Sequence, residues 1–264
     1  MTLRRPEQAP RHAGALDHWR AATRVTCVSG TSAGAIVLAA GSSHRMQGQD
    51  KLLLPLAGRP LIIHTLRAFE QTADIEQVVV VLAAHNAEAI LPLLRHFKKV
   101  THTCMGGRRR QDSVRHGLYT LPAFDWIVVH DGARPFVTPA LIRRGLEAAR
   151  RTGAAAAAVP VTDTLKAAQA DGLVLRTVPR EGLWVVQTPQ VFRYDLLLQA
   201  HEQVSEDVTD DCAMLERLGH PVLLYEGSRL NFKVTTPEDA WLAEAVARAR
   251  RKDLTQWGSP SAGP

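Results

Sequence analysis

Short apolar segments alternate with amphipathic, helix-like segments along most of the chain, and this alternation limits the possible folds more than any other feature. Residues 35–39 (AIVLA) form a continuous apolar run followed closely by a glycine, which is typical of a strand buried on both faces of a parallel sheet. A helical pattern opens at Pro60, where Ile62, Leu66 and Phe69 share one face. This spacing predicts an α/β fold with a doubly wound, mostly parallel (Rossmann-like) sheet, in which ligands bind beyond the carboxyl ends of the strands.

The alternation continues beyond these first elements. Further strands are predicted at residues 77–82, 100–103, 126–130, 154–159 and 222–225. Further helices are predicted at residues 88–96, 112–121, 139–151, 195–203 and 209–218, and a last one opens at 237–239. We therefore expect one domain that spans residues 34–252.

The rhythm breaks between about residues 162 and 187. Asp171 and Gly172 offer a turn between residues 163–168 and 173–178, which predicts a β-hairpin arm. A hairpin outside the main sheet has little core of its own, so we expect a second copy of the chain to cover it. The sequence therefore predicts a homodimer formed through this arm.

Positive charge is concentrated at the N-terminus. Residues 1–33 contain five arginines against one aspartate and one glutamate, and so supply three of the six net positive charges. We expect this extension and the tail at residues 253–264 to be disordered. Aromatic residues make up 5% of the chain and its one dense basic run is at residues 108–110, which argues against a nucleic-acid-binding protein.

The sequence also bears on location. No apolar run reaches the roughly 18 residues that span a bilayer, and no signal peptide is visible, so we expect no membrane association. Cys27, Cys104 and Cys212 are odd in number and widely spaced, without a CxxC pair. This pattern indicates neither a disulfide framework nor a zinc site, and it favours a reducing, cytoplasmic location.

A glycine-containing loop, LAAGSSHRM at residues 38–46, follows the first strand and precedes Lys51. Its pattern is neither GxGxxG nor GxxxxGKS/T, so neither the dinucleotide fingerprint nor the P-loop applies. Gly41 lets backbone amides approach a nucleotide closely, and Arg45 and Lys51 supply two cations on one loop. Fixed cations suit attack at phosphorus, because negative charge accumulates on the phosphoryl oxygens and on departing pyrophosphate. The alternative is an ordinary surface loop with solvated charges.

Two further motifs lie beside predicted elements. In GGRRRQDSV at residues 106–114, Asp112 or Ser113 caps a helix, or the helix-end amides and the serine hydroxyl bind a base or a phosphate. In HDGAR at residues 130–134, a buried strand ends at Asp131. That carboxylate is placed either to hold the Mg²⁺ that accompanies a nucleoside triphosphate or to cap the next turn.

Taken in order, the motifs resemble those of the 2-C-methyl-D-erythritol 4-phosphate cytidylyltransferase family over roughly residues 34–250. The segments that carry the resemblance are LAAGSSHRM (38–46), Lys51, GGRRRQDSV (106–114), HDGARP (130–135), PVTDTLK (160–166), TVPREGLW (177–184), QTPQVF (187–192), TDD (209–211) and NFKVTTPED (231–239). The first motif alone indicates only the broad nucleotidyltransferase superfamily, whereas the ordered series is specific.

The resemblance implies a sheet of the nucleotidyltransferase type with a dimerisation arm at about residues 162–187. It also implies a CTP-dependent enzyme that transfers CMP to 2-C-methyl-D-erythritol 4-phosphate in non-mevalonate isoprenoid precursor synthesis. The products would be 4-diphosphocytidyl-2-C-methyl-D-erythritol and pyrophosphate.

The resemblance further implies roles for individual residues. The expected catalytic residues are Arg45, Lys51, Arg180 and Lys233, of which Arg45 and Lys51 match the cations that stabilise the transition state. Positions around CTP are Ala39, Ala40, Gly41, Gly107 and Ser113. Asp131 matches the position near the substrate and Mg²⁺, for which other divalent cations could substitute. Positions that bind or orient the acceptor are Arg134, Thr164, Arg180, Thr209 and Lys233, with Thr164 and Arg180 on the arm that reaches into the partner's site.

The sequence departs from the usual family pattern near Lys51. The loop at residues 47–50 (QGQD) is shorter than usual and lacks a proline, which puts the placement of Lys51 in question. His44 stands where a second basic residue is common, and Arg108 stands where an acidic residue is common. Three rival interpretations stay open: a ribitol-5-phosphate cytidylyltransferase, a molybdenum-cofactor guanylyltransferase that shares the first loop, and a non-catalytic nucleotide-binding module of the same fold.

Overall fold

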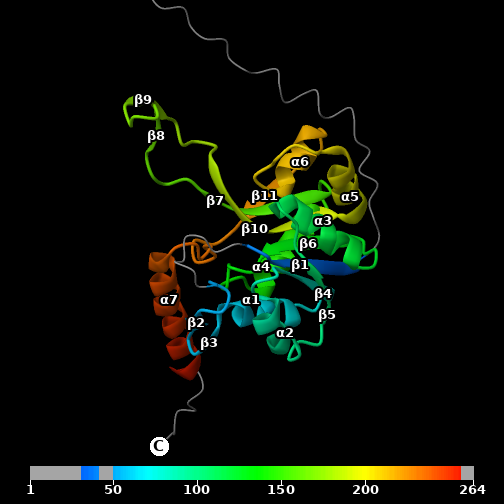
Figure 1. Ribbon diagram of the computed structural model, residues 1–264. Helices are drawn as coiled ribbons and strands as arrows, with labels where there is room; N and C mark the ends of the chain where they lie inside the picture. The colour runs from blue at the N-terminus through cyan, green and yellow to red at the C-terminus, as the bar shows by residue number, and fades with distance from the viewer. Residues whose placement is uncertain (1–30, 42–49, 257–264) are drawn as a thin grey trace, which may run out of the picture.

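Seven strands form the central sheet: β1 (Ala33–Ala39), β4 (Ile75–Leu82), β5 (Val100–Met105), β6 (Trp126–Asp131), β7 (Ala154–Pro160), β10 (Trp184–Arg193) and β11 (Leu223–Glu226). The computed structural model describes residues 31–41 and 50–256. The strand order is β11-β7-β10-β6-β1-β4-β5 (Figure 1), and every neighbouring pair is parallel except the two pairs that include β10. The predicted doubly wound, mostly parallel α/β fold is therefore confirmed.

Helices cover both faces of this sheet. They are α1 (Leu61–Glu70), α2 (Ala87–Leu94), α3 (Arg110–Thr120), α4 (Pro139–Ala149), α5 (Tyr194–Gln203), α6 (Asp211–Arg217) and α7 (Pro237–Gln256). The core on one face includes side chains of α1, α2, α4 and α7, and the core on the other includes side chains of α3, α5 and α6. A short hairpin, β2 (Pro55–Leu56) and β3 (Arg59–Pro60), precedes α1.

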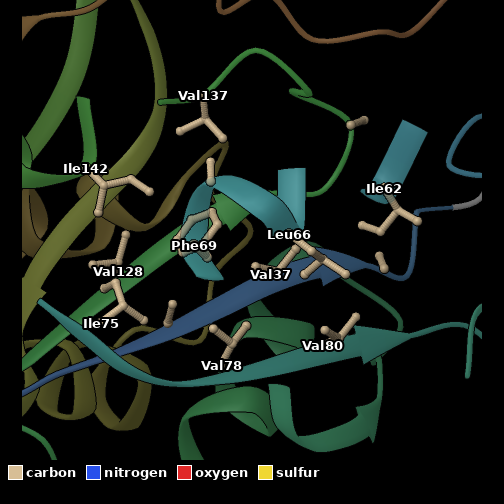
Figure 2. Packing of buried hydrophobic residues seen from close by; sticks show 14 of the residues in the cluster. Val37, Ile62, Leu66, Phe69, Ile75, Val78, Val80, Val128, Val137 and Ile142 are labelled. Carbon is tan, nitrogen blue, oxygen red and sulfur yellow. The ribbon is translucent and has the colours of Figure 1, made fainter. Parts of the chain in front are cut away.

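The two cores follow from the alternation of side chains along buried strands. In β1, Val37 belongs to the core under α1 and its neighbour Ile36 to the core under α3. Figure 2 shows Leu66 and Phe69 of α1 lying over Val37 and Val78 of the sheet. Fully burying a side chain such as that of Phe69 stabilises the fold by roughly 1.5–3 kcal/mol, and this face of α1 was predicted from its spacing.

β10 is the one strand of the main sheet that the sequence did not predict. It runs antiparallel between β6 and β7, and its register shifts between Val186 and Gln190. Gln187, Thr188 and Gln190 are all buried in it, although polar residues and a proline suggest a loop. Their burial is tolerated because each forms hydrogen bonds with other segments.

The predicted hairpin arm is present as β8 (Leu165–Ala168) paired antiparallel with β9 (Val174–Val178). Gly172 has φ of +88° in the turn, a conformation that favours glycine. The arm projects away from the rest of the protein (Figure 1), and the side chains of Leu173, Val174 and Leu175 are each at least 60% exposed.

The ends of the ordered domain differ slightly from the predicted bounds. β1 begins at Ala33, inside the predicted extension, and α7 continues to Gln256, past the expected boundary at residue 252. The remaining parts of the two expected disordered segments, residues 1–30 and 257–264, lie outside the described residues. Among the described helices, none has the length and apolar composition needed to cross a membrane.

Candidate active site

A cavity of about 310 Å³, here called the first cavity, lies where β1 and β6 end. Its lining residues are Leu38, Ala40, Gly41, Lys51, Leu52, Gly107, Arg108, Arg109, Arg110, Ser113, Asp131, Ala133 and Lys233. Parallel strands end at the same edge of a sheet, so residues from distant motifs meet there. Seven residues predicted for the site line this cavity: Ala40, Gly41, Lys51, Gly107, Ser113, Asp131 and Lys233.

The Asp131 carboxylate lies among three cations. Lys233 Nζ is 2.9 Å from its Oδ2, Arg134 Nε is 3.6 Å from the same oxygen, and Arg110 Nε is 3.5 Å from Oδ1. Burial alone would raise the pKa of Asp131, but the charges of Arg110, Lys233 and Arg134 hold that pKa far below its usual range. The carboxylate therefore stays ionised, and the cluster keeps an excess of positive charge suited to a polyphosphate.

A buried polar network fixes the position of Asp131. Its backbone N–H donates to Thr188 Oγ1 at 3.0 Å, and Thr188 Oγ1 is also 3.0 Å from His130 Nδ1. Burial lowers the pKa of His130 to about 3, so the ring is neutral, accepts from Thr188 and donates through Nε2 to the carbonyl oxygen of Arg134 at 3.3 Å. Asn231 Nδ2 donates to the Thr188 carbonyl at 2.8 Å. β10 and the NFKVTTPED segment thus support the end of β6.

Lys51 reaches the first cavity because the residue before it is anchored. Asp50 Oδ2 accepts a hydrogen bond of 2.7 Å from Asn86 Nδ2, and the same amide donates to the Ala39 carbonyl at 2.8 Å. Asn86 is fully buried, so it ties Asp50 to the end of β1. Lys51 therefore lines the cavity, although the sequence departs from the family pattern just before it. Arg45, its predicted companion, lies outside the described residues.

The GGRRRQDSV segment forms the N-terminal end of α3. Asp112 Oδ2 accepts from the Arg109 backbone N–H at 3.1 Å, so the predicted capping role is confirmed for Asp112. Ser113 Oγ accepts from the Gly107 N–H at 3.1 Å and donates to the Arg109 carbonyl at 3.2 Å, while it also lines the cavity. A Cβ at Gly107 would lie 2.3 Å from the Cβ of Asp112, which only glycine avoids.

Arg110 is a site residue that the sequence reasoning missed. It lies 3.5 Å from Asp131 and also pairs, through NH1, with Asp211 Oδ2 at 2.6 Å. Asp211 is completely buried, and its Oδ1 lies 3.6 Å from Nε2 of the buried His201. Burial would raise the pKa of Asp211, but Arg110 and His201 lower it. The residue before Asp211, Asp210, caps α6 by accepting from the Ala213 N–H.

Other predicted residues lie at or beyond the edge of this arrangement. Arg134 is ion-paired with Asp131 and donates to the Asn231 carbonyl at 2.8 Å, but it does not line the cavity. Ala39 is buried within β1. Thr164, Arg180 and Thr209 are exposed and away from the lining, and Arg180 donates to the Thr162 carbonyl within the arm region. One chain thus holds only part of the predicted set in the first cavity.

The described residues offer little for a metal held by protein alone. They contain no group of three or more histidine, cysteine, aspartate or glutamate side chains that could hold a metal ion. Asp131 is the single carboxylate among the residues that line the first cavity. A lone carboxylate fits Mg²⁺, which proteins commonly bind through one or two carboxylates together with substrate phosphates and water.

The site is equipped for charge stabilisation. His130 is buried and both ring nitrogens are engaged, so it is not available as a base. Lys51, Arg110 and Lys233 instead present cations that suit a reaction in which charge develops on phosphate oxygens.

Comparison with known proteins gives one consistent result. A family model described as 2-C-methyl-D-erythritol 4-phosphate cytidylyltransferase matches residues 33–249. A protein of that name from Dehalococcoides mccartyi is 46% identical over 220 residues, which cover 83% of this chain and 97% of the relative. Another, from Pelotomaculum thermopropionicum, is 46% identical over 232 residues and covers 85% and 98% of the two chains.

Solved structures agree with the sequence matches. The crystal structure of 2-C-methyl-D-erythritol 4-phosphate cytidylyltransferase from Thermus thermophilus is 38% identical, with a TM-score of 0.69 over 82% of this chain and 99% of that one. That of 4-diphosphocytidyl-2C-methyl-D-erythritol synthase from Anaerococcus prevotii is 28% identical, with a TM-score of 0.74 over 82% and 96%.

Proposed function

The chain belongs to the 2-C-methyl-D-erythritol 4-phosphate cytidylyltransferase family, and we propose that its first cavity binds CTP and directs transfer of CMP to that acceptor. The observation that carries the proposal is the meeting of Lys51, Asp131 and Lys233, from three separate motifs, in one positively charged cavity.

The reaction needs no protein nucleophile. An oxygen of the acceptor's phosphate attacks the α-phosphorus of CTP and forms a new phosphorus–oxygen bond. The bond from the α-phosphorus to the oxygen that bridges to the β-phosphorus breaks, and its electron pair leaves with pyrophosphate. A phosphate monoester is largely ionised at neutral pH, so no general base is required. Orientation of the two phosphates and stabilisation of the developing charge supply the rate enhancement.

The cavity suggests how the roles are divided. Lys51, with Arg45 as its predicted companion, stabilises charge on the α-phosphate and on pyrophosphate. The backbone near Gly41 and Gly107 and the hydroxyl of Ser113 surround the nucleotide, as do the predicted neighbours Ala39 and Ala40. Lys233, held 2.9 Å from Asp131, orients the attacking phosphate.

Arg134 supports this arrangement from behind the cavity. Arg134 is paired with Asp131, and this pairing keeps the carboxylate directed toward the proposed acceptor position. The predicted acceptor contacts Thr164, Arg180 and Thr209 complete the set, with the first two supplied by the arm of a partner chain.

Asp131 is also the residue that would hold Mg²⁺, together with phosphates of CTP. The ion would neutralise charge on the triphosphate, as it does for nucleoside triphosphates in general. We expect chelation of divalent cations to stop turnover and added Mg²⁺ to restore it. Full activity after exhaustive chelation would contradict this assignment.

The arm supports the proposed homodimer. Leu173, Val174 and Leu175 lie on it and Trp184 and Val185 follow it, and all five side chains are more than 40% exposed. Several exposed apolar side chains on and beside one projecting arm are typical of a surface that a partner covers, and a second copy of the chain is the expected cover.

We also propose a cytoplasmic location. Cys104 and Cys212 are both free thiols, as in proteins of reducing compartments, and CTP is an intracellular nucleotide.

The activity itself is tested by comparing acceptors. Purified protein, CTP and Mg²⁺ are incubated with 2-C-methyl-D-erythritol 4-phosphate or with ribitol 5-phosphate, and products are followed by phosphorus NMR. We expect the first acceptor to give a diphosphate diester and pyrophosphate at a kcat/KM well above that of the second. Preferential use of ribitol 5-phosphate would assign the chain to the rival activity, and no turnover with either would favour a non-catalytic module.

A further inference from the structure

The end of β6 and the segment that follows it contribute to two cavities. Asp131 and Ala133 line the first, and residues 135–139 line a second cavity of about 560 Å³. The other walls of the second cavity come from the β2–β3 hairpin, from α1 and from α7. No motif of the predicted site falls in it apart from the end of HDGARP.

The second cavity is strongly basic. Its lining includes Arg59, His64, Arg67 and Arg250, and no acidic residue. In the described part of the chain, none of the three arginines forms an ion pair. The guanidinium of Arg250 lies 5.0 Å from the ring centre of Phe136, so an aromatic face holds it at the cavity.

The electrostatic environment agrees with this geometry. Burial lowers the pKa of Arg250. Burial also lowers the pKa of His64, and the charges of Arg67 and Arg59 lower it further. A hydrogen bond to the Leu56 carbonyl partly opposes this shift. Arg59 and Arg67, from separate elements, therefore both act on His64 at the cavity wall.

The carboxylate of Glu244 acts on His64 at the cavity wall, but it already has partners of its own. Glu244 Oε2 accepts a hydrogen bond of 2.7 Å from the Ala57 backbone N–H, and its Oε1 pairs with Arg248 Nε at 2.7 Å. Glu244 thus stabilises the β2–β3 hairpin and α7, and Arg248 offsets its charge. The positive charge that lines the second cavity is left for a ligand to neutralise.

We propose that the second cavity is a binding site for a phosphorylated small molecule that carries at least two negative charges. Guanidinium groups bind phosphate oxygens through paired hydrogen bonds, and three of them on three elements suit a ligand charged at more than one point. The apolar wall at residues 135–137 accommodates the uncharged part of such a molecule. The site is separate from the proposed chemistry and does not depend on it.

Inorganic pyrophosphate is a suitable probe, titrated into the protein by isothermal calorimetry. Wild-type protein is expected to bind it at two sites. Arg67→Gln combined with Arg250→Gln should weaken one of them at least about tenfold, because two charge-assisted guanidinium–phosphate contacts are lost. Lys51→Ala should instead weaken the other site.

The control is Arg143→Gln combined with Arg151→Gln, which removes the same charge from exposed positions outside both cavities. It should leave both binding events unchanged. Arg59→Gln, at an exposed position, provides a second test should the double substitution affect folding. A wild-type protein with a single site that Lys51→Ala abolishes, or second-cavity variants with unchanged stoichiometry and affinity, would overturn the proposal.

Discussion

Replacing Asp211 by asparagine removes a charge that lies inside the protein beside the first cavity. The substitution keeps the size of the side chain but leaves Arg110 next to a neutral amide instead of a carboxylate 2.6 Å away. Asp211 is completely buried, whereas the Arg110 side chain is 26% exposed and keeps Asp131 as a second partner at 3.5 Å.

The structure sets the expected size of the effect. Removing one partner of a buried ion pair costs about 3–5 kcal/mol, because the remaining charge is left uncompensated. Partial exposure of Arg110 and its second partner place the loss near the lower limit, at about 3 kcal/mol. For a protein of this size, each kcal/mol lowers Tm by about 2–4 °C, so Tm should fall by about 6–12 °C.

Thermal unfolding followed by circular dichroism, with urea titrations as a second measure, checks this prediction. Asp195→Asn is the matched control, because Asp195 lies 2.5 Å from Arg193 but is 62% exposed. That loss should stay within about 1 kcal/mol. Equal destabilisation by the two substitutions would refute the argument that burial decides the strength of the Arg110 pair. We also expect Asp211→Asn to lower kcat/KM about tenfold, because Arg110 loses the group that positions it at the cavity.

Three further predictions concern the site, the core and the arm. Lys51→Ala should lower kcat at least about a hundredfold with little change in Tm, because this charge acts mainly on the transition state. Near-normal turnover in steady-state kinetics would show that Lys51 has no such role. The pKa of His130 falls to about 3 on folding. Below about pH 6.5 the unfolded chain therefore binds a proton that the folded chain does not. As a result, the unfolding free energy decreases as the pH falls, by about 1.4 kcal/mol per pH unit. His130→Gln should therefore flatten the decline in unfolding free energy between about pH 6.5 and 4.5, and an unchanged slope would contradict a buried neutral ring. Leu175→Glu on the arm should shift the sedimentation of the protein toward that of a monomer, whereas Leu91→Glu, at an exposed leucine of α2, should not. A dimer that neither substitution affects would show that the arm does not hold the dimer together.

The parallel part of the fold could be predicted because its strands are buried on both faces. The runs at residues 35–39 and 77–82 are almost wholly apolar, a pattern typical of strands covered on both faces. β10 was not predicted, because several of its buried residues are polar. Its buried Gln187 and Thr188 bond with segments distant in sequence, 41 and 57 residues away, which no local pattern reveals.

The candidate site divides in the same way. Lys51 and Asp131 could be placed together from sequence, because motifs after parallel strands converge on one edge of the sheet, whereas the place of Lys233 followed from the family resemblance. The pairing of Arg110 with Asp211 could not be predicted, since these residues are 101 positions apart and no local pattern links them. Charge alone did not distinguish Arg110 from its neighbours in the basic run.

A crystal structure of the protein with CTP and Mg²⁺ tests the central claim most directly. We predict that the triphosphate lies in the first cavity, with its oxygens in contact with Lys51 and the cytosine close to Gly107 and Ser113. A triphosphate bound elsewhere, such as among the arginines of the second cavity, with Lys51 directed into solvent, would contradict the claim.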